Sequence, residues 1–320
     1  MSGNNMKFAG QTRVKKHDDV AWIDVENPTS EVFDQLEADY HLHPFHLNES
    51  TQKIQLNKVE RESKYLFLLL HIPVANGADN LIVEQVGVFL GKNYLITIHN
   101  QPSQVIDELF GLFESSAGHK QEYAAKGPGY LLYGVIKRVL DNIWTISQDM
   151  LNELDAIEGL VFDNNKSDAY SIGKARQKIV RLRQIIGSLK VMLDDLAEQI
   201  NSFSGTHLAK YYANNTKAAN KLWEVIEEAK ETVEIYKDAD FTTSTEQTNQ
   251  ILAILTLVFT FTIPITVVGT LYGMNVPLPG GLATGAWTFL GTYTSFGLLL
   301  TVSCVSALAM FLYFKRKKWF

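Results

Sequence analysis

The sequence predicts an α+β domain with long helices, followed by a two-helix transmembrane hairpin near the C-terminus. Three observations support this prediction. The first 120 residues combine apolar runs of strand length with helical patterns. No Pro or Gly interrupts the residues from Thr206 to Gln250, which favours one long helix. No Asp, Glu, Lys or Arg occurs from Gln247 to Phe314, and core helices of soluble proteins rarely stay free of charge for so long.

The N-terminal part of the chain carries the strand signals. Runs rich in aliphatic and aromatic residues predict strands near 20–25, 54–60, 64–72, 82–90 and 93–98. Apolar residues at helical spacing predict helices at 29–40, 43–50, 103–116, 128–160, 168–203 and about 208–245. Strands followed by a series of helices are typical of the α+β class. We expect the last of these helices to continue unbroken into the membrane.

Two apolar runs predict the membrane hairpin. Ile251 to Tyr272 would form about 33 Å of helix, enough to cross a hydrocarbon core of about 30 Å. A second apolar run is long enough to span the bilayer with tilt, and the Pro and Gly residues between the two predict a loop. We therefore expect a cytoplasmic α/β domain at 1–120, a long-helix stalk region at 121–246 and a first membrane helix at 247–272. An outer loop at 273–286, a second membrane helix at 287–314 and a basic tail at 315–320 would follow.

Charge predicts the orientation. The basic tail Lys315–Lys318 directly follows the second apolar run, which favours a cytoplasmic C-terminus. Two crossings then place the N-terminal domain on the same side. The first residues are polar and lack the apolar core of a signal peptide. We expect a multi-pass protein of the plasma membrane, in contact with the lipid bilayer, with both termini in the cytoplasm.

Composition narrows the functional classes. All 35 acidic residues precede Gln247, and the tail takes four of the 29 basic residues, so the N-terminal part is acidic. An acidic surface disfavours nucleic acid and attracts cations. Cys304 is the one cysteine, so no disulfide forms within the chain. We find no nucleophile–base pattern, metal-hydrolase motif or phosphate-binding loop, and we expect neither enzymatic activity nor a bound cofactor.

The first membrane helix carries a stripe of residues at alternating steps of three and four, a spacing that places them on one side of a helix in a bundle. The stripe is polar at both ends and apolar in its middle, and it comprises Asn249, Leu252, Thr256, Phe259, Ile263, Thr266 and Thr270. Because one hairpin encloses no pore, a conducting path would need several subunits. Alternatively, the Thr hydroxyls bond back to their own helix.

The segment Tyr272-Gly273-Met274-Asn275, at the predicted outer end of the first membrane helix, resembles the signature of the CorA family of magnesium transporters. The basic ending 315–319 is similar too, as are Trp22–Thr29, Leu42-His43-Pro44 and Lys64–Leu70. The resemblance covers essentially the whole chain. It implies a funnel-shaped homopentamer in which each subunit gives one helix to a central pore.

The resemblance also implies roles for single residues. Gly273, Met274 and Asn275 would form the selectivity filter, where Asn275 and Gly273 bind the ion through its hydration waters. Mg²⁺ sheds its water reluctantly, so neutral acceptors that bond to those waters suit it. The family's polar pore positions match Thr266 and Asn249, its hydrophobic gate matches Leu255, and other lining positions match Leu252 and Ile263. The transported ion would be Mg²⁺, with Co²⁺ or Ni²⁺ as further candidates.

Two other functions fit the same pattern. A ZntB-like zinc transporter would share this architecture, although zinc favours imidazole and thiolate ligands, which the stripe lacks. A non-conducting, membrane-anchored interaction scaffold would use the long helices only for assembly. His41, His43 and His46 also suggest a zinc site, but Pro44 interrupts the segment and no acidic or Cys partner is evident. We predict that these histidines serve packing at a helix start.

Overall fold

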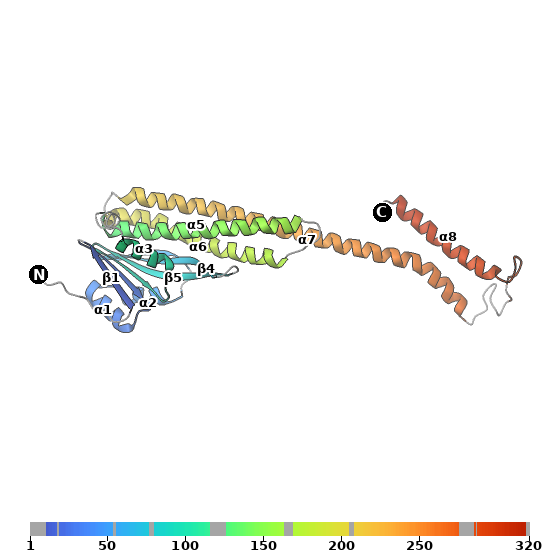
Figure 1. The fold of residues 1–320 in the computed structure, drawn as a ribbon, viewed down its shortest axis with the longest axis horizontal. Coiled ribbons are helices and arrows are strands. Elements are labelled where there is room, and N and C mark those ends of the chain that lie inside the picture. Colours follow the sequence, from blue (N-terminus) through green and yellow to red (C-terminus); the bar gives the residue numbers. More distant parts are fainter. Residues whose placement is uncertain are drawn as a thin grey trace. The chain divides into compact units, whose positions relative to one another are not determined.

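The computed structural model describes residues 11–17, 19–53, 56–76, 80–115, 126–162, 169–204, 208–274, 285 and 287–317. The chain separates into two compact units, Met1–Asp240 and Phe241–Phe320. Figure 1 shows the mixed sheet and long helices of the first unit and the two apolar helices of the second. Each unit is described by itself.

A mixed six-stranded sheet organises the first unit. Its strands are β1 Gln11–His17, β2 Val20–Glu26, β3 Lys58–Arg61, β4 Tyr65–Asn76, β5 Asn80–Gly91 and β6 Tyr94–His99. They lie in the order β1-β2-β6-β5-β4-β3. The β2–β6 pair is parallel and the other pairs are antiparallel. The α+β class predicted from the sequence is confirmed, and β1 is a strand that the sequence pattern did not predict.

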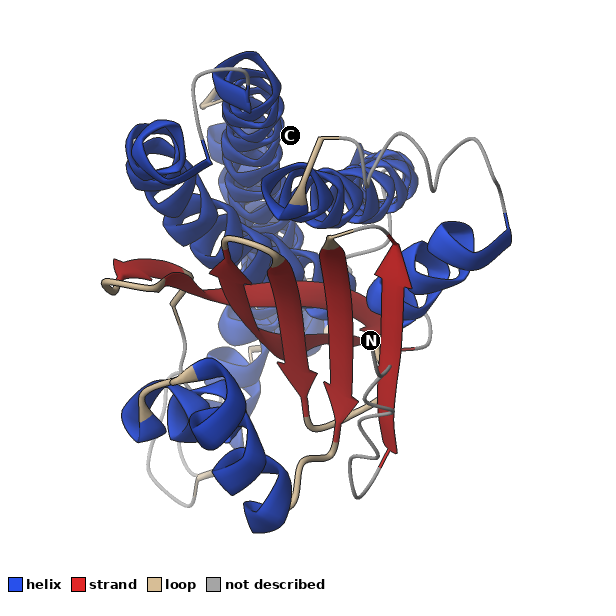
Figure 2. Cartoon of the chain, turned by 90° about the vertical axis from the view of Figure 1, so that its left-hand side faces the viewer, coloured by secondary structure: helices blue, strands red, loops and turns tan. Residues whose placement is uncertain are grey.

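Helices cover both faces of this sheet, as Figure 2 shows. On one face lie α1 Ser30–Tyr40 and α2 Pro44–Thr51, packed on Phe67, Leu69 and Ile98. On the other face, α3 Gln104–Ser115, α5 Pro128–Phe162, α6 Ala169–Ser204 and the first part of α7 Ala209–Gly273 share a second core with Leu66, Leu68 and Leu70. Successive residues of β4 thus point to opposite cores, which explains why the strand is apolar at nearly every position.

A buried ionic network joins β1, β2 and β6. Asp24 is fully buried, and its carboxylate accepts hydrogen bonds from Arg13 at 2.5 Å, from His99 at 3.2 Å and from the Thr97 hydroxyl. Burial alone would raise the pKa of Asp24, but these hydrogen bonds and the charge of His99 outweigh it and lower the pKa. Burial alone would lower the pKa of His99. The hydrogen bond to Asp24 and the charge of Asp24 outweigh burial, so the pKa of His99 is raised. The strands are therefore joined by charged partners.

This network predicts a pH dependence of stability. A raised His99 pKa gives stability that is complete below about pH 6.5 and is lost as the pH rises through the folded-state value. We expect the free energy of unfolding to fall as the pH rises above about 6.5, and to fall less in the His99→Gln variant. Unfolding of the detergent-solubilised chain, followed by near-UV circular dichroism, measures this. Equal pH slopes in the two proteins would contradict the assignment.

Two long helices form most of the described part of the second unit. Among the described residues, two helices are long and apolar enough to cross a membrane: the one that contains the C-terminal part of α7, from Phe241 to Gly273, and α8 Thr294–Arg316. α8 covers the later part of the predicted segment 287–314 and extends to Arg316. Helix α7 runs without a break from Ala209 to Gly273, so the predicted continuation of the last long helix into the first apolar span is confirmed.

Candidate ion pathway and metal-ligating residues

Helix α7 presents the predicted stripe on the surface of the second unit. Leu252, Leu255, Phe259 and Ile263 are each about half exposed, at 53, 47, 54 and 54 %. Asn249, Thr256, Thr266 and Thr270 are exposed as well. Leu255 flanks the stripe between Leu252 and Phe259, three residues after one and four before the other. The chain by itself leaves these side chains uncovered.

The threonines of the stripe bond to their own helix. The hydroxyl of Thr256 donates to the carbonyl of Leu252 at 2.7 Å, Thr266 donates to Thr262 at 2.8 Å, and Thr270 donates to Thr266 at 2.7 Å. This is the alternative that the sequence left open. Each of these hydroxyl protons is donated within the helix, while the oxygen lone pairs remain free to accept hydrogen bonds. Water molecules around a cation present their hydrogens outward, so such oxygens suit a hydrated cation.

The predicted selectivity segment lies at the end of α7. Gly273 is the last residue of the helix, and the Met274 N–H donates to the carbonyl of Leu271 at 3.3 Å. Both residues are exposed. Asn275 lies outside the described residues. Pro264 lies inside the helix, where its missing N–H frees the carbonyl of Thr260 and permits a bend.

Ion pairs occupy part of the acidic helical region of the first unit. Arg183 of α6 pairs with Glu227 of α7, and Arg176 pairs with Glu234 at 2.7 Å. Lys178 pairs with Glu153 of α5 at 2.7 Å. Basic residues of α6 therefore neutralise several of the acids that α5 and α7 present. These carboxylates thus join α6 to α5 and to α7.

The structure gives different roles to the histidines that were predicted to serve packing. His43 is the N-cap of α2, and its Nδ1 accepts from the N–H of Phe45 at 3.1 Å, so the helix-start role is confirmed for it. His46 is 4 % exposed and stacks on Phe67 at 4.4 Å between ring centroids. Its Nε2 lies 2.9 Å from the carboxylate of Glu60 on β3. The expectation that it has no acidic partner is therefore wrong.

His46, Glu49 and Glu60 form a group of metal-ligating side chains. Their ligand atoms lie within 4.8 Å of one another. The ammonium of Lys58 lies in this group, 2.7 Å from Glu49 and 2.8 Å from Glu60. The hydrogen bond from Lys58 is the largest influence on the pKa of Glu60, which lies below its ordinary value, so this carboxylate is ionised at neutral pH.

Known proteins with the same architecture match this chain. The family described as "CorA-like Mg2+ transporter protein" matches residues 17–316. The chain is 23 % identical to "Cobalt/magnesium transport protein CorA" of Thermotoga maritima over 301 residues, covering 93 % of this chain and 83 % of the relative. The full-length CorA magnesium transporter of Methanocaldococcus jannaschii superposes with a TM-score of 0.77 at 19 % identity, covering 99 % of this chain and 94 % of that one.

A second solved structure bears on the zinc alternative. The ZntB cytoplasmic domain from Vibrio parahaemolyticus superposes with a TM-score of 0.58 at 17 % identity, over 71 % of this chain and 88 % of that one. At this identity the likeness shows a shared fold. The family model spans nearly the whole chain, and the family is one of transporters rather than enzymes. The chain therefore belongs to the CorA-like Mg²⁺ transporter family, whose members carry divalent cations across membranes.

Proposed function

We propose that the chain forms a homopentameric channel that passes hydrated Mg²⁺ into the cytoplasm down its electrochemical gradient. The observation that carries this proposal is the α7 stripe, an exposed row of apolar side chains with polar residues at both ends. Such a row is stable in a ring of identical helices, which gives a pore with polar mouths and a narrow apolar stretch. The basic residues Lys315 and Arg316 at the end of α8 support a cytoplasmic C-terminus.

The chemistry of the stripe favours a hydrated ion over a stripped one. No Asp or Glu occurs anywhere from Gln247 to Phe314, so strong chelation within the span has no ligand set. The Thr266 and Thr270 oxygens, with protons donated to the helix, are acceptors for the hydrogens of ion-bound water. The carbonyl of Gly273 and the side chain of Asn275 would supply further acceptors at the outer mouth. Weak contacts of this kind also let the ion leave, as conduction requires.

The membrane potential supplies the driving force in this proposal. Moving a divalent cation inward gains about 4.6 kcal/mol per 100 mV. No phosphate-binding loop is present in the sequence, which agrees with passive entry. Mg²⁺ is favoured over Zn²⁺ because the stripe holds neither His nor Cys, the side chains that zinc prefers. Co²⁺ and Ni²⁺, which form similar hydrated ions, are secondary cargoes.

The selectivity assignment is tested with Asn275→Ala in proteoliposomes. We expect Mg²⁺ influx, reported by an entrapped fluorescent indicator, to fall by about tenfold or more, a loss of roughly 1.4 kcal/mol of stabilisation along the path. Asn152→Ala is the matched control, because Asn152 is an exposed amide of α5 outside the apolar helices. Unchanged Mg²⁺ influx in Asn275→Ala would overturn the role of this residue.

A further inference from the structure

We propose that His46, Glu49 and Glu60 form a binding site for a transition-metal dication, Zn²⁺, Co²⁺ or Ni²⁺, which occupies it by displacing the ammonium of Lys58. The site lies in the first unit and does not rest on the ion pathway of α7. Its three ligands come from α2 and β3, and their ligand atoms already lie within 4.8 Å of one another. One imidazole and two carboxylates with room for water form a common ligand set for these metals.

Helix α2 holds two of the ligands in fixed positions. His46 and Glu49 are three residues apart, so they lie on the same side of the helix, and both are buried, at 4 and 8 % exposure. The amide of Gln85 on β5 donates to the carbonyls of Glu49 at 2.9 Å and Gln52 at 2.6 Å. The end of the helix is thereby fixed to the sheet, which keeps the ligands in place when the site changes its occupant.

Gly87 of β5 allows α2 to approach this closely. A Cβ atom at Gly87 would lie 2.2 Å from the hydroxyl oxygen and 2.5 Å from the Cβ of Ser50 on α2. The Ser50 hydroxyl in turn donates to the carbonyl of His46 at 2.9 Å. The strand therefore accepts only glycine at this contact unless the helix moves. Close packing of helix on strand is what brings His46 and Glu49 up to Glu60.

Lys58 shows that the site attracts a cation. Its ammonium lies 2.8 and 2.7 Å from the two oxygens of Glu49 and 2.8 Å from Glu60. The Lys58 side chain is one-quarter exposed and that of Glu60 is 43 % exposed, so the site opens to solvent on this side. A lysine side chain is long and flexible, and it can leave toward solvent when a dication takes its place. A dication in this position would place two positive charges between the two carboxylates, where Lys58 places one.

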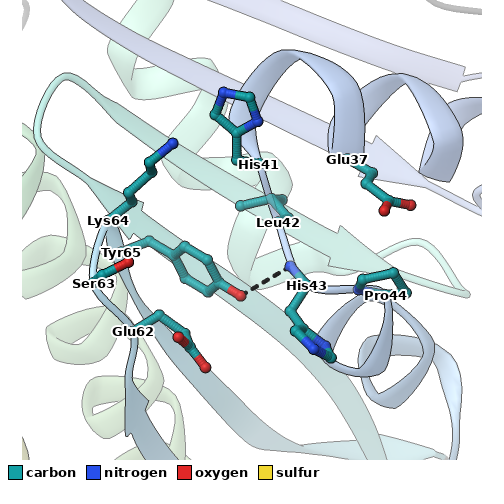
Figure 3. A pocket seen from close by; sticks show the side chains of 9 residues that line it. All are labelled: Glu37, His41, Leu42, His43, Pro44, Glu62, Ser63, Lys64 and Tyr65. Carbon is teal, nitrogen blue, oxygen red and sulfur yellow. Dashed lines mark hydrogen bonds between the residues drawn. The ribbon is translucent and has the colours of Figure 1, made fainter.

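Tyr65 provides the outer support that a metal-bound histidine requires. Its hydroxyl lies 2.8 Å from His46 Nδ1 and accepts from the backbone N–H of His43 at 3.0 Å. With Nε2 bound to metal, Nδ1–H would donate to the same oxygen, which has a second lone pair for it. Tyr65 also lines a surface cavity of about 400 Å³. Figure 3 shows its hydroxyl between His43 and Glu62, which line the same cavity. Water in the cavity can take the hydroxyl proton as a hydrogen bond.

The ligand set selects the class of metal. Mg²⁺ prefers six oxygens in near-ideal octahedral geometry, so a ligand set that includes the imidazole nitrogen of His46 disfavours it. Zn²⁺, Co²⁺ and Ni²⁺ accept imidazole and carboxylate together, with affinities that rise from Co²⁺ to Ni²⁺. The site would therefore respond to transition metals in the presence of a large excess of Mg²⁺.

Cobalt absorption tests the proposal on the full-length protein in detergent, freed of metal with a chelator. Co²⁺ in a site with an imidazole and two carboxylates gives intense visible bands if four-coordinate, whereas hydrated Co²⁺ in an ion pathway absorbs weakly. We expect one such Co²⁺ per chain, displaced by Zn²⁺ and retained in millimolar Mg²⁺. Isothermal titration with Zn²⁺ provides the affinity even if the bound Co²⁺ takes more ligands.

Variants of the site separate the proposal from a simple salt-bridge network. Glu60→Gln, on a half-exposed side chain, should weaken Zn²⁺ binding by roughly 10–100-fold or more, and Tyr65→Phe by roughly 10–100-fold. Lys58→Met should strengthen it, because the competing ammonium is gone. Glu31→Gln is the matched control, since Glu31 is an exposed glutamate of α1 outside the group and outside the cavity. Zn²⁺ binding that is absent, unchanged in Glu60→Gln, or abolished equally by Mg²⁺ would overturn the site.

Discussion

Divalent-cation flux through the Ile263→Cys variant should fall at least about tenfold when a cationic methanethiosulfonate reagent modifies the new thiol. The reagent places a fixed positive charge in the apolar middle of the α7 stripe. At roughly 8 Å, a dication and a unit charge repel by about 4 kcal/mol at an effective dielectric of 20 and by about 1 kcal/mol in bulk water. Several identical subunits would each add such a charge. The native Cys304 is exposed and is first replaced by Ser.

Ile265→Cys is the matched control for this experiment. Ile263 and Ile265 are the same residue type with nearly the same exposure in the chain, 54 and 57 %. Two positions along a helix correspond to about 200°, so the two side chains lie on opposite sides of α7. We expect the reagent to leave flux through Ile265→Cys unchanged. Equal inhibition at both positions, or none at Ile263→Cys, would show that the stripe does not line the pathway.

The Asp24→Ala variant should lose about 3–5 kcal/mol of folding free energy, the usual cost of removing one partner from a buried ion pair. The carboxylate of Asp24 is the shared partner of Arg13, Thr97 and His99. Its removal leaves the buried donors Thr97 and His99 of β6, and the partly exposed Arg13 of β1, without this acceptor. Chemical unfolding of the detergent-solubilised chain, followed by circular dichroism, measures the loss.

The exposed Asp34 on α1 supplies the comparison for this stability prediction. Asp34→Ala removes the same side chain from a solvated helix surface, where changes usually stay within about 0.5 kcal/mol. If Asp24→Ala destabilises the chain no more than Asp34→Ala does, the buried network contributes little. Thr97→Val is a milder change in the same network and should give an intermediate loss.

The sequence predicted the elements that have strong local patterns. β4 is apolar at nearly every position because both of its faces are buried, and α7 lacks Pro and Gly until the apolar span begins. β1 escaped prediction because its sequence, QTRVKKH, is basic and polar with Val14 as its one aliphatic residue. Pairing with β2 and the ion pair of Arg13 with Asp24 hold it in place. Those contacts are tertiary and leave no periodic signal.

The candidate sites show the same division. The stripe on α7 follows from spacing within one helix, so the sequence could predict it. The pairing of Arg183 with Glu227 joins two helices, and the contact of His46 with Glu60 joins a helix to a strand. Glu227 is distant in sequence from Arg183, and Glu60 belongs to a different element from His46. Inspection of the residues next to the histidines therefore missed Glu60. Asn275, the residue most important to the selectivity prediction, lies outside the described residues and stays a prediction.

Ion influx into proteoliposomes under an imposed inside-negative potential tests the central claim most directly. Mg²⁺, Co²⁺, Ni²⁺ and Zn²⁺ are compared side by side in separate vesicles of one preparation. We predict that Mg²⁺ enters fastest, that Co²⁺ and Ni²⁺ follow, and that influx rises as the potential becomes more negative inside. Zn²⁺ influx exceeding that of Mg²⁺, or no influx of any of the four ions above that of protein-free vesicles, would contradict the proposed function.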